Sequence, residues 1–489
     1  MKMNKRLALV LMLALLIQTT AACGFDANDG TTTTADDSGE TTEAEVTTES
    51  PTAHIPDNDF EGYEFRMLDI KAPAGWTTIS YGDDLWVESE NGEIFNDAVW
   101  KRNQAVTEKY NFTISLELDE IANVVPRVNR LVAAGDHEYD LVFARLYEAP
   151  QLVYNRSLLD LNELPVIDFS KPWWDQNSVK DLSIGGKLYF AAGDMTTMDK
   201  DATYCVIYNK KLADNYQVPD LYDLVYNGKW TFDAMSDYMK RATTDLNGDT
   251  VIDRNDRFGM LGSHDAIGGL FRSAGGLLAD KNKDDMIELS FASERNFTII
   301  DKIFDITYSD DFLNIHLENM TNQEFRDMFA EDKGLFIWNT VEMLAYLRTK
   351  DVEFGILPCP KYEETQDRYL NMITVHQTGL MSVPVTEPDL ERTGTIIEAL
   401  TAASDNVQSA YYDVNLNVKG VRDEESVDML KLIFANRVYD VGDIFFSDIS
   451  YEFLSIQSTG SRDIASFWAK KEKTVQNKLN KLLKALELE

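Results

Sequence analysis

Apolar runs alternate with helical patterns along the first globular part of the chain. Apolar spacing predicts helices over 93–110 and 121–134, and strands are predicted over 63–70, 112–118 and 139–144. Strands separated by helices of this length are typical of βαβ units and a mostly parallel sheet. Ligand sites in such sheets lie beyond the carboxyl ends of the strands. The loop with Arg145 and Tyr147 is therefore predicted at the mouth of a site.

The same alternation continues through the rest of the chain. Further strands are predicted over 187–192, 202–208, 334–338, 352–358 and 374–384. A helix is predicted after Trp230, to about residue 242. The tail from Ser461 onward also reads as helical, with one apolar face made by Leu479, Leu482, Leu483 and Leu486. The pattern as a whole predicts the α/β fold class.

The N-terminus has the three parts of a secretory signal. Positive residues precede an apolar run over 7–17, and small residues follow it. The run is shorter than the roughly 20 apolar residues of a membrane-spanning helix. Small side chains before Cys23 resemble the lipobox of bacterial lipoproteins, although Thr20 stands where leucine is usual. We expect 1–23 to be a lipoprotein signal peptide with Cys23 acylated; ordinary secretion is the alternative.

The segment 24–58 has a different composition from the rest of the chain. It is rich in Thr, Asp and Glu, contains no Lys or Arg, and has few apolar residues. Such a segment buries too little surface to offset its ordering entropy, so we predict a disordered tether. Its average reach would be on the order of 30 Å. A spacer of this kind suits a protein anchored at the extracellular face of a Gram-positive membrane.

Length and charge limit what the folded part can be. The remaining residues, roughly 430, exceed what one hydrophobic core supports, so two or more lobes are expected. The formal net charge of −37 argues against nucleic-acid binding and against contact of the folded part with an anionic membrane. Besides Cys23 the chain contains Cys205 and Cys359, without CxxC spacing. Both lie in apolar runs that favour buried free thiols, and a disulfide between them stays open.

Several segments resemble extracellular solute-binding proteins of ABC importers, family 1, the group of maltose-binding-protein-like lipoproteins. They are Lys-Pro-Trp-Trp-Asp at 171–175, Asp-Leu-Ser-Ile-Gly-Gly-Lys-Leu-Tyr at 181–189, Gly-Leu-Phe-Ile-Trp at 334–338 and Phe-Gly-Ile-Leu-Pro at 354–358. The resemblance implies a two-lobed periplasmic-binding-protein type II fold with a hinge between the lobes. It places lobe 1 at 59–203 plus 358–405 and lobe 2 at 204–357 plus 406–489. It further implies a monomer that captures a sugar and delivers it to a membrane permease.

Sugar rings stack on aromatic side chains, and sugar hydroxyls bond to polar ones, which gives a set of candidate ligand-binding residues. The candidates near predicted strand ends or loops are Trp76, Asp140, Arg145, Tyr147, Trp174, Asp194, Trp230 and Trp338. The alternative for each aromatic residue is core packing. For Trp230 this alternative is specific: a core residue at a helix start, with Thr231 as the cap.

A calcium loop is the sharpest local motif. In Asp-Leu-Asn-Gly-Asp-Thr-Val-Ile-Asp-Arg-Asn-Asp at 245–256, oxygen ligands fall at the spacing of EF-hand or dockerin-type loops. The candidate ligands are Asp245, Asn247, Asp249, the Val251 carbonyl, Asp253 and Asp256. Thr250 replaces the usual glycine, and Asp256 replaces the bidentate glutamate of EF-hands. We expect structural Ca²⁺ here; a solvated acidic turn is the alternative.

Signals for catalysis are weak. The chain has no HExxH, GxSxG or phosphate-binding glycine motif, and its five histidines are scattered in sequence. The run Gly-Ser-His-Asp at 262–265 holds the residue types of a catalytic triad, but neighbouring residues do not reach the relay geometry. We therefore predict that this protein is not an enzyme. An extracellular carbohydrate-active enzyme with two acidic residues, and a surface adhesion or sensing module, remain the alternatives.

Overall fold

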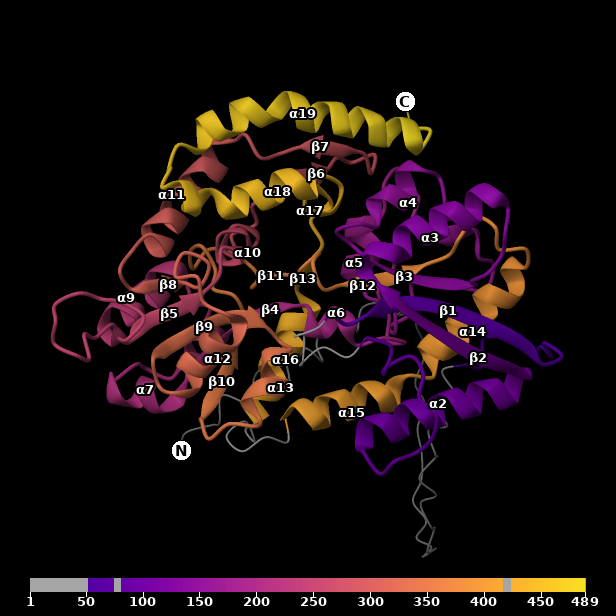
Figure 1. Ribbon diagram of the computed structural model, residues 1–489, viewed down its shortest axis with the longest axis horizontal. Helices are drawn as coiled ribbons and strands as arrows, with labels where there is room; N and C mark the ends of the chain where they lie inside the picture. Colours follow the sequence, from indigo (N-terminus) through magenta and orange to yellow (C-terminus); the bar gives the residue numbers. More distant parts are fainter. Residues whose placement is uncertain (1–51, 74–80, 417–423, 489) are drawn as a thin grey trace, which may run out of the picture. The chain divides into compact units, whose positions relative to one another are not determined.

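A computed structural model describes residues 52–73, 81–416 and 424–488 (Figure 1). Trp76, Cys23, the signal segment and most of the predicted tether lie outside the described residues. In the described part, the first sheet has the order β12-β3-β1-β2. Its strands are β1 (Tyr63–Lys71), β2 (Phe112–Glu120), β3 (Leu141–Arg145) and β12 (Gly379–Ser382). The strands β1, β2 and β3 run parallel, as the βαβ pattern predicts, and β12 is antiparallel to β3.

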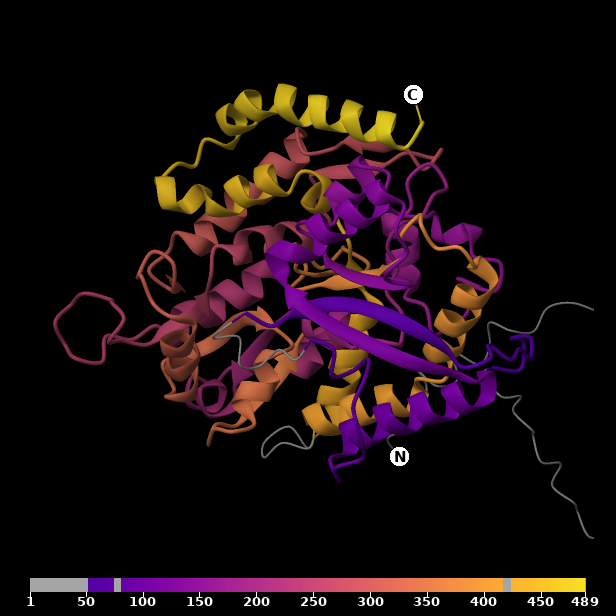
Figure 2. The same cartoon turned by 45° about the vertical axis from the view of Figure 1, so that its right-hand side comes forward.

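A second sheet follows the order β10-β4-β9-β5-β8 in the described residues. Its strands are β4 (Tyr204–Asn209), β5 (Phe258–Gly262), β8 (Phe312–Asn314), β9 (Gly334–Thr340) and β10 (Phe354–Leu357). The strands β5, β8 and β9 are parallel, whereas β4 is antiparallel to β9 and β10. Figures 1 and 2 show the two sheets in separate parts of the fold, here called the first and second lobes.

The chain passes between the lobes along adjacent segments. Thr203, just before β4, bridges Ile373, and the Thr374 amide donates to the Ala202 carbonyl at 3.0 Å. Two short parallel strands, β11 (Asn371–Met372) and β13 (Arg437–Val438), lie at the same place. This adjacency forms the hinge of the fold. A further two-stranded hairpin consists of β6 (Ala279–Lys281) and β7 (Ile287–Leu289).

Helices cover the two sheets. In the first part of the chain they are α2 (Ile94–Tyr110), α3 (Ile121–Ala134), α4 (Pro150–Tyr154), η1 (Leu161–Glu163), α5 (Gln176–Leu182) and α6 (Met198–Asp201). The second lobe adds α7 (Lys210–Asn215), α8 (Leu221–Tyr226), α9 (Phe232–Ala242), α10 (Asp265–Ser273), α11 (Glu294–Thr307), α12 (Asn322–Ala330) and α13 (Met343–Leu347). None of the described helices combines the length and apolarity required to cross a membrane.

The C-terminal part of the chain is almost entirely helical. It contains α14 (Leu390–Ala402), α15 (Asp405–Leu416), α16 (Glu424–Ala435), α17 (Val441–Phe445), α18 (Ser447–Leu454), η2 (Ser455–Thr459) and α19 (Ile464–Ala485). Helix α15 packs along α2, α16 against β10, and α19 against both α4 and α11 (Figure 1). These helices therefore contact both lobes. The residue limits predicted for the lobes stay a prediction.

Strand β4 explains how one sheet serves two cores. All of its residues are buried. Val206 and Tyr208 belong to the larger apolar core, whereas Cys205 and Ile207 face a second core on the other side of the sheet. Both faces of such a strand are covered by helices, so the strand reads as a continuous apolar run.

Local signals predict many helix ends, but one predicted strand does not form, and strands such as β5 and β8 were not predicted. Helix α3 coincides with the predicted 121–134 and ends at Gly135, which takes φ 74°. Helix α9 starts after Thr231, whose hydroxyl accepts a hydrogen bond from the Ala234 amide, as predicted. The predicted strand over 187–192 is wrong: only isolated bridges form there, from Lys187 to Ile184 and from Ala191 to Met381. Cys205 and Cys359 are buried free thiols.

Candidate functional site

A pocket of about 290 Å³ lies where the parallel strands of the second lobe end. The loops after β5, β8 and β9 and the segment 374–377 supply most of its lining. Lining residues used below are Tyr204, Ser263, His264, Asp265, His316, Arg326, Trp338, Glu342, Thr374, His376, Gln377 and Tyr451. The carboxyl ends of parallel strands are where α/β sheets bind ligands.

The first lobe reaches this pocket through the segment 374–377. Arg145, at the end of β3, donates to the His376 carbonyl at 3.1 Å. The Tyr147 ring lies 4.8 Å from the His376 ring, measured between centroids. The Tyr81 hydroxyl donates to the Gln377 carbonyl at 2.6 Å. The pocket is therefore bounded by second-lobe residues and by a segment held by the first lobe, and we refer to it as the cleft.

A row of five rings runs across the cleft. Neighbouring ring centroids in the order His316, His264, Tyr451, His376 and Tyr147 are 4.2, 5.4, 6.2 and 4.8 Å apart. Tyr451 is 46% exposed, so its ring is accessible to a ligand. Rings of this kind provide flat apolar faces beside hydrogen-bonding groups.

Electrostatics keep the inner histidine of this row neutral near pH 7. Desolvation in the cleft lowers the pKa of His376. The His316 side chain is exposed at the rim, but packing against its neighbours and the charge of His264 lower its pKa as well. A neutral imidazole offers one donor and one acceptor to a ligand.

Some buried polar atoms in the cleft wall have no hydrogen-bond partner among the described residues. Such atoms include Nε1 of Trp338 and Oε1 of Gln377. Trp338 is 1% exposed and stacks on Tyr204, with ring centroids 6.0 Å apart. Leaving such atoms unpaired costs about 1–3 kcal/mol each. A polar ligand in the cleft would offset that cost.

Some of the ligand-binding residues predicted from the sequence lie at the cleft and others do not. Trp338 lines the cleft, and Arg145 and Tyr147 contact its lining residue His376. Trp174 and Trp230 are corrections: they are 2% and 0% exposed. Their indole groups donate to Glu398 and to the Pro358 carbonyl. Burial of a large aromatic side chain stabilises the folded state more than exposure on a loop does, and both indoles also have a hydrogen-bond partner there. Both residues therefore belong to the core.

Asp140 is also a correction, because it lies at the start of β3, at the end opposite to Arg145. It belongs to the one group in the described residues, with His137 and Glu387, in which three metal-ligating side chains converge. Arg66 lies 3.1 Å from His137 Nδ1, so that nitrogen accepts and Nε2 carries the proton. The Nε2–H lies 3.0 Å from Asp140 and 2.9 Å from Glu387. The imidazole nitrogen that faces the carboxylates thus has no lone pair free for a metal, and the contacts form a network that includes the Arg66–Asp140 ion pair.

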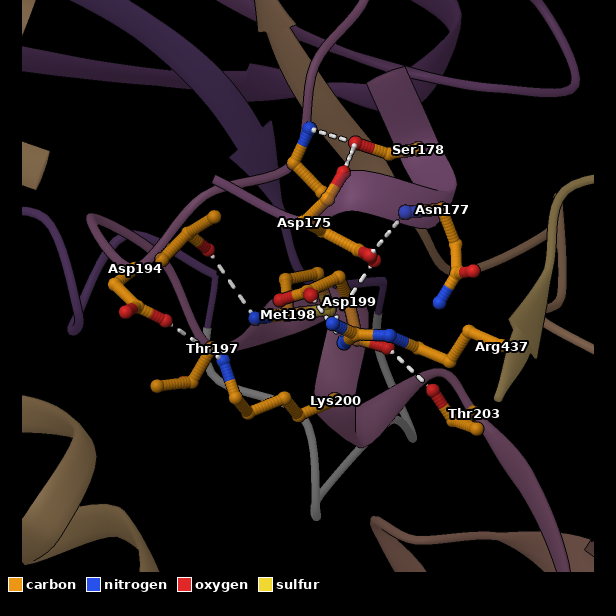
Figure 3. Close-up of polar contacts among 12 residues, drawn as sticks. Asp175, Asn177, Ser178, Asp194, Thr197, Met198, Asp199, Lys200, Thr203 and Arg437 are labelled. Carbon is orange, nitrogen blue, oxygen red and sulfur yellow. Dashed lines mark hydrogen bonds and ion pairs between the residues drawn. The ribbon is translucent and has the colours of Figure 1, made fainter. Parts of the chain in front are cut away.

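Asp194 lies outside the cleft, in a polar cluster near the hinge (Figure 3). It pairs with Lys200 at 3.3 Å. In the same cluster Arg437 of β13 pairs with Asp199 of α6 and with Asp175, which caps α5. Figure 3 shows the guanidinium lying against both carboxylates. The cluster ties three elements together where the chain passes between the lobes.

A larger cavity, about 550 Å³, lies between α5 and the β6–β7 hairpin. Among its charged side chains, Lys281 pairs with Asp285 at 2.5 Å, and Arg272 pairs with Asp440 at 3.2 Å. No parallel strand of either sheet ends in its lining. The position at the carboxyl ends of the parallel strands thus favours the smaller cleft as the ligand site.

The histidines are what sequence reasoning missed. His264, His316 and His376 are scattered in the chain, yet they meet in one row of rings. The available signal was the position of His264, which directly follows the apolar run that forms β5. Ser263 donates to Asp265 at 3.0 Å, which leaves its proton away from His264. The Ser-His-Asp run therefore lacks the hydrogen bonds of a nucleophilic triad.

The loop 245–256 projects from the second lobe (Figure 2) and is folded by its own carboxylates. Both oxygens of Asp245 accept backbone amides, from Gly248 and Thr250. Thr250 takes φ 70°, the conformation that glycine would adopt at this position. The turn thus matches the motif. Its acidic side chains form no convergent group of ligand atoms like that of His137, among the residues described.

No protein-family model matches the chain, and a search of curated proteins finds no similar sequence. Solved structures are similar in fold. A cyclo/maltodextrin-binding protein complexed with maltotetraose is 16% identical, with a TM-score of 0.54 over 87% of this chain and 96% of its own. An ABC substrate-binding protein from Listeria monocytogenes in complex with cycloalternan is 14% identical, with a TM-score of 0.53 over 88% and 100%.

A third neighbour carries a different ligand. UgpB from Mycobacterium tuberculosis in complex with glycerophosphocholine is 14% identical, with a TM-score of 0.54 over 78% of this chain and 95% of its own. At these identities the likeness shows the fold. The chain has the two-lobed α/β fold of periplasmic binding proteins, which confirms the predicted fold class and the fold that the resemblance implies.

Proposed function

We propose that this protein is the substrate-binding component of an ABC importer and captures a sugar or oligosaccharide between its lobes without chemical conversion. The observation that carries the proposal is the cleft. It combines a row of rings with unpaired polar atoms at the carboxyl ends of the strands, next to the hinge. Closure of two lobes around a ligand is a known hinge motion. Solved neighbours of the same fold hold maltotetraose and cycloalternan, which supports a sugar.

The N-terminal segment completes the proposal. Acylation of Cys23 would anchor the protein at the extracellular face of the membrane, and the acidic tether would hold the lobes away from it. The protein would act as a monomer that presents its closed form to a permease. Mass spectrometry of the membrane fraction tests the anchor: a lipid-modified peptide beginning at Cys23 supports it, and a mature N-terminus elsewhere contradicts it.

Neutral oligosaccharides are expected to stabilise the purified protein against heat. A ligand that binds only the folded state adds about 2.7 kcal/mol at 100 times its dissociation constant. Maltose, maltotriose, cyclodextrin and cellotriose form the first panel, and products are followed by chromatography. A saturable shift without product supports the proposal. Turnover would favour the carbohydrate-active enzyme, and no shift with any sugar would contradict sugar capture.

Tyr451→Ala is expected to weaken that binding at least tenfold, because the exposed ring in the middle of the row would no longer stack on the ligand. Tyr226→Ala is the matched control, since Tyr226 is similarly exposed, at 54%, and does not line the cleft. Isothermal titration with the sugar found in the panel measures both. Equal affinities of the two variants would contradict the assignment of the cleft.

We also propose that the loop 245–256 binds structural Ca²⁺. The ion would draw the oxygens of Asp245, Asn247, Asp249, Asp253, Asp256 and the Val251 carbonyl around one centre. Millimolar Ca²⁺ is then expected to raise the melting temperature of the wild type but not that of Asp245→Asn. Asp284→Asn, an exposed acidic residue in another turn, should respond like the wild type. An equal response of all three proteins would contradict the site.

A further inference from the structure

The charge of the cleft narrows the ligand beyond the class of sugars, and this inference rests on the proposed function. Arg326 is the one arginine or lysine among the lining residues described, and it pairs with Glu342. Arg145, which approaches the cleft from the first lobe, pairs with Glu148. Each guanidinium near the ligand space is therefore neutralised by a carboxylate of its own.

Asp265 is left as the carboxylate without an arginine or lysine partner among the described residues. It begins α10 at the wall of the cleft, and its side chain is 20% exposed. Its described contacts are the Ser263 hydroxyl at 3.0 Å, the Tyr204 hydroxyl and, at 3.7 Å, Nε2 of His264. No arginine or lysine pairs with it among the described residues.

The surroundings reinforce this negative charge. Burial and the Asp265 carboxylate raise the pKa of Tyr204, which reflects a charge acting across the cleft wall. The formal net charge of the whole chain is −37 at pH 7. Clefts lined by one sign of charge concentrate ligands of the other sign.

We propose that the cleft selects a sugar that carries an amine, with the ammonium group at Asp265, and rejects acidic sugars. A desolvated carboxylate gains most from a ligand that supplies the missing cation through a charge-assisted hydrogen bond. A carboxylated sugar in the same position meets a like charge, which costs several kcal/mol. A neutral sugar has neither the attraction nor the repulsion, so its affinity lies between those of the amino sugar and the acidic sugar.

The test compares sugars that differ mainly in charge. Dimers and trimers of glucosamine, glucose and galacturonic acid are titrated into the purified protein at pH 7 and low salt. Glucosamine oligomers are expected to bind at least tenfold more tightly than glucose oligomers, and galacturonic acid oligomers at least tenfold more weakly. Asp265→Asn should reduce the preference for glucosamine to less than threefold. Asp310→Asn, in an exposed turn before β8, should retain it.

The outcomes separate this inference from the proposed function. Equal or tighter binding of galacturonic acid oligomers, or equal binding of glucosamine and glucose oligomers, overturns the inference and leaves sugar capture standing. A response to none of the sugars contradicts both. If the Asp265→Asn variant keeps the full preference for glucosamine, Asp265 is not the residue that binds the ammonium group. If that variant melts before the measurement, the order of the three sugars with the wild type decides.

Discussion

Replacing Arg437 by methionine is expected to lower the free energy of unfolding by about 3–5 kcal/mol, because it breaks a buried ion pair and leaves charge behind. Arg437 and its partners Asp199 and Asp175 are 6%, 1% and 7% exposed at their side chains. Both carboxylates raise the pKa of Arg437 against the opposing effect of burial, so the guanidinium stays charged.

The position of this ion pair makes the effect large. Arg437 belongs to β13, Asp199 to α6 and Asp175 to the start of α5 (Figure 3). The Tyr439 hydroxyl also donates to Asp175, at 2.7 Å. Methionine keeps an unbranched apolar stem but is shorter than arginine and lacks the guanidinium with its five donors. Two carboxylates would then lose their shared cation at the hinge.

A matched control separates burial from charge. Arg462→Met removes an ion pair with Asp305 whose side chains are 47% and 71% exposed, and its cost should stay below about 1 kcal/mol. Chemical denaturation of both variants measures the difference. A cost for Arg437→Met as small as that for Arg462→Met would contradict a role of the cluster in holding the hinge elements together.

The stability of the protein is expected to rise from pH 7 to pH 5, and Asp201 accounts for a large share. Burial, followed by the charges of Glu342, Asp84 and Asp199, raises its pKa from 3.8 to about 7. Between those values the folded state holds a proton that the unfolded state has released. The stabilising contribution is therefore complete below pH 3.8 and is lost as the pH rises through 7. Across two pH units it amounts to roughly 2 kcal/mol.

Asp201→Asn isolates this contribution. The amide stays neutral at every pH, and its oxygen still accepts from the Tyr411 hydroxyl, which now donates to Asp201 at 2.6 Å. The gain in stability from pH 7 to pH 5 should be roughly 2 kcal/mol smaller than in the wild type. Asp310→Asn should follow the wild type. His376 has the opposite effect on stability: because its pKa is lowered in the folded state, its contribution to stability rises with pH. This contribution is the same in the wild type and the variant, so it cancels when the two are compared. Identical pH profiles for wild type and Asp201→Asn would contradict the raised pKa.

Local patterns predicted much of the fold. The helices 94–110 and 121–134 and the parallel strands around them follow directly from the spacing of apolar residues. The prediction of a strand over 187–192 was wrong because an apolar run indicates burial but does not show that the segment pairs with another strand. That segment is buried through loops, and only Ala191 meets a neighbouring strand.

The site was predicted less well than the fold. Trp338 near the end of β9 and the Arg145–Tyr147 loop after β3 lie at or beside the cleft because the position of strand ends is encoded locally, and their role in binding stays a prediction. Trp174 and Trp230 were misplaced for a related reason. Aromatic residues near loops pack inward as readily as they face a ligand, and their exposure depends on what covers them.

The sequence by itself determined the helices and strands that local apolar spacing indicates and the negative charge of the protein, and it predicts an export signal and an acidic tether. These depend on neighbouring residues and on composition. Only the tertiary structure decided that His264, His316 and His376 share a cleft with Tyr451, that Asp265 has no lysine or arginine partner among the described residues, and that Asp140 lies at the far end of β3. The three histidines and Tyr451 are separated from one another by fifty or more positions in the sequence, and they meet only when strand order and lobe crossing bring distant loops together.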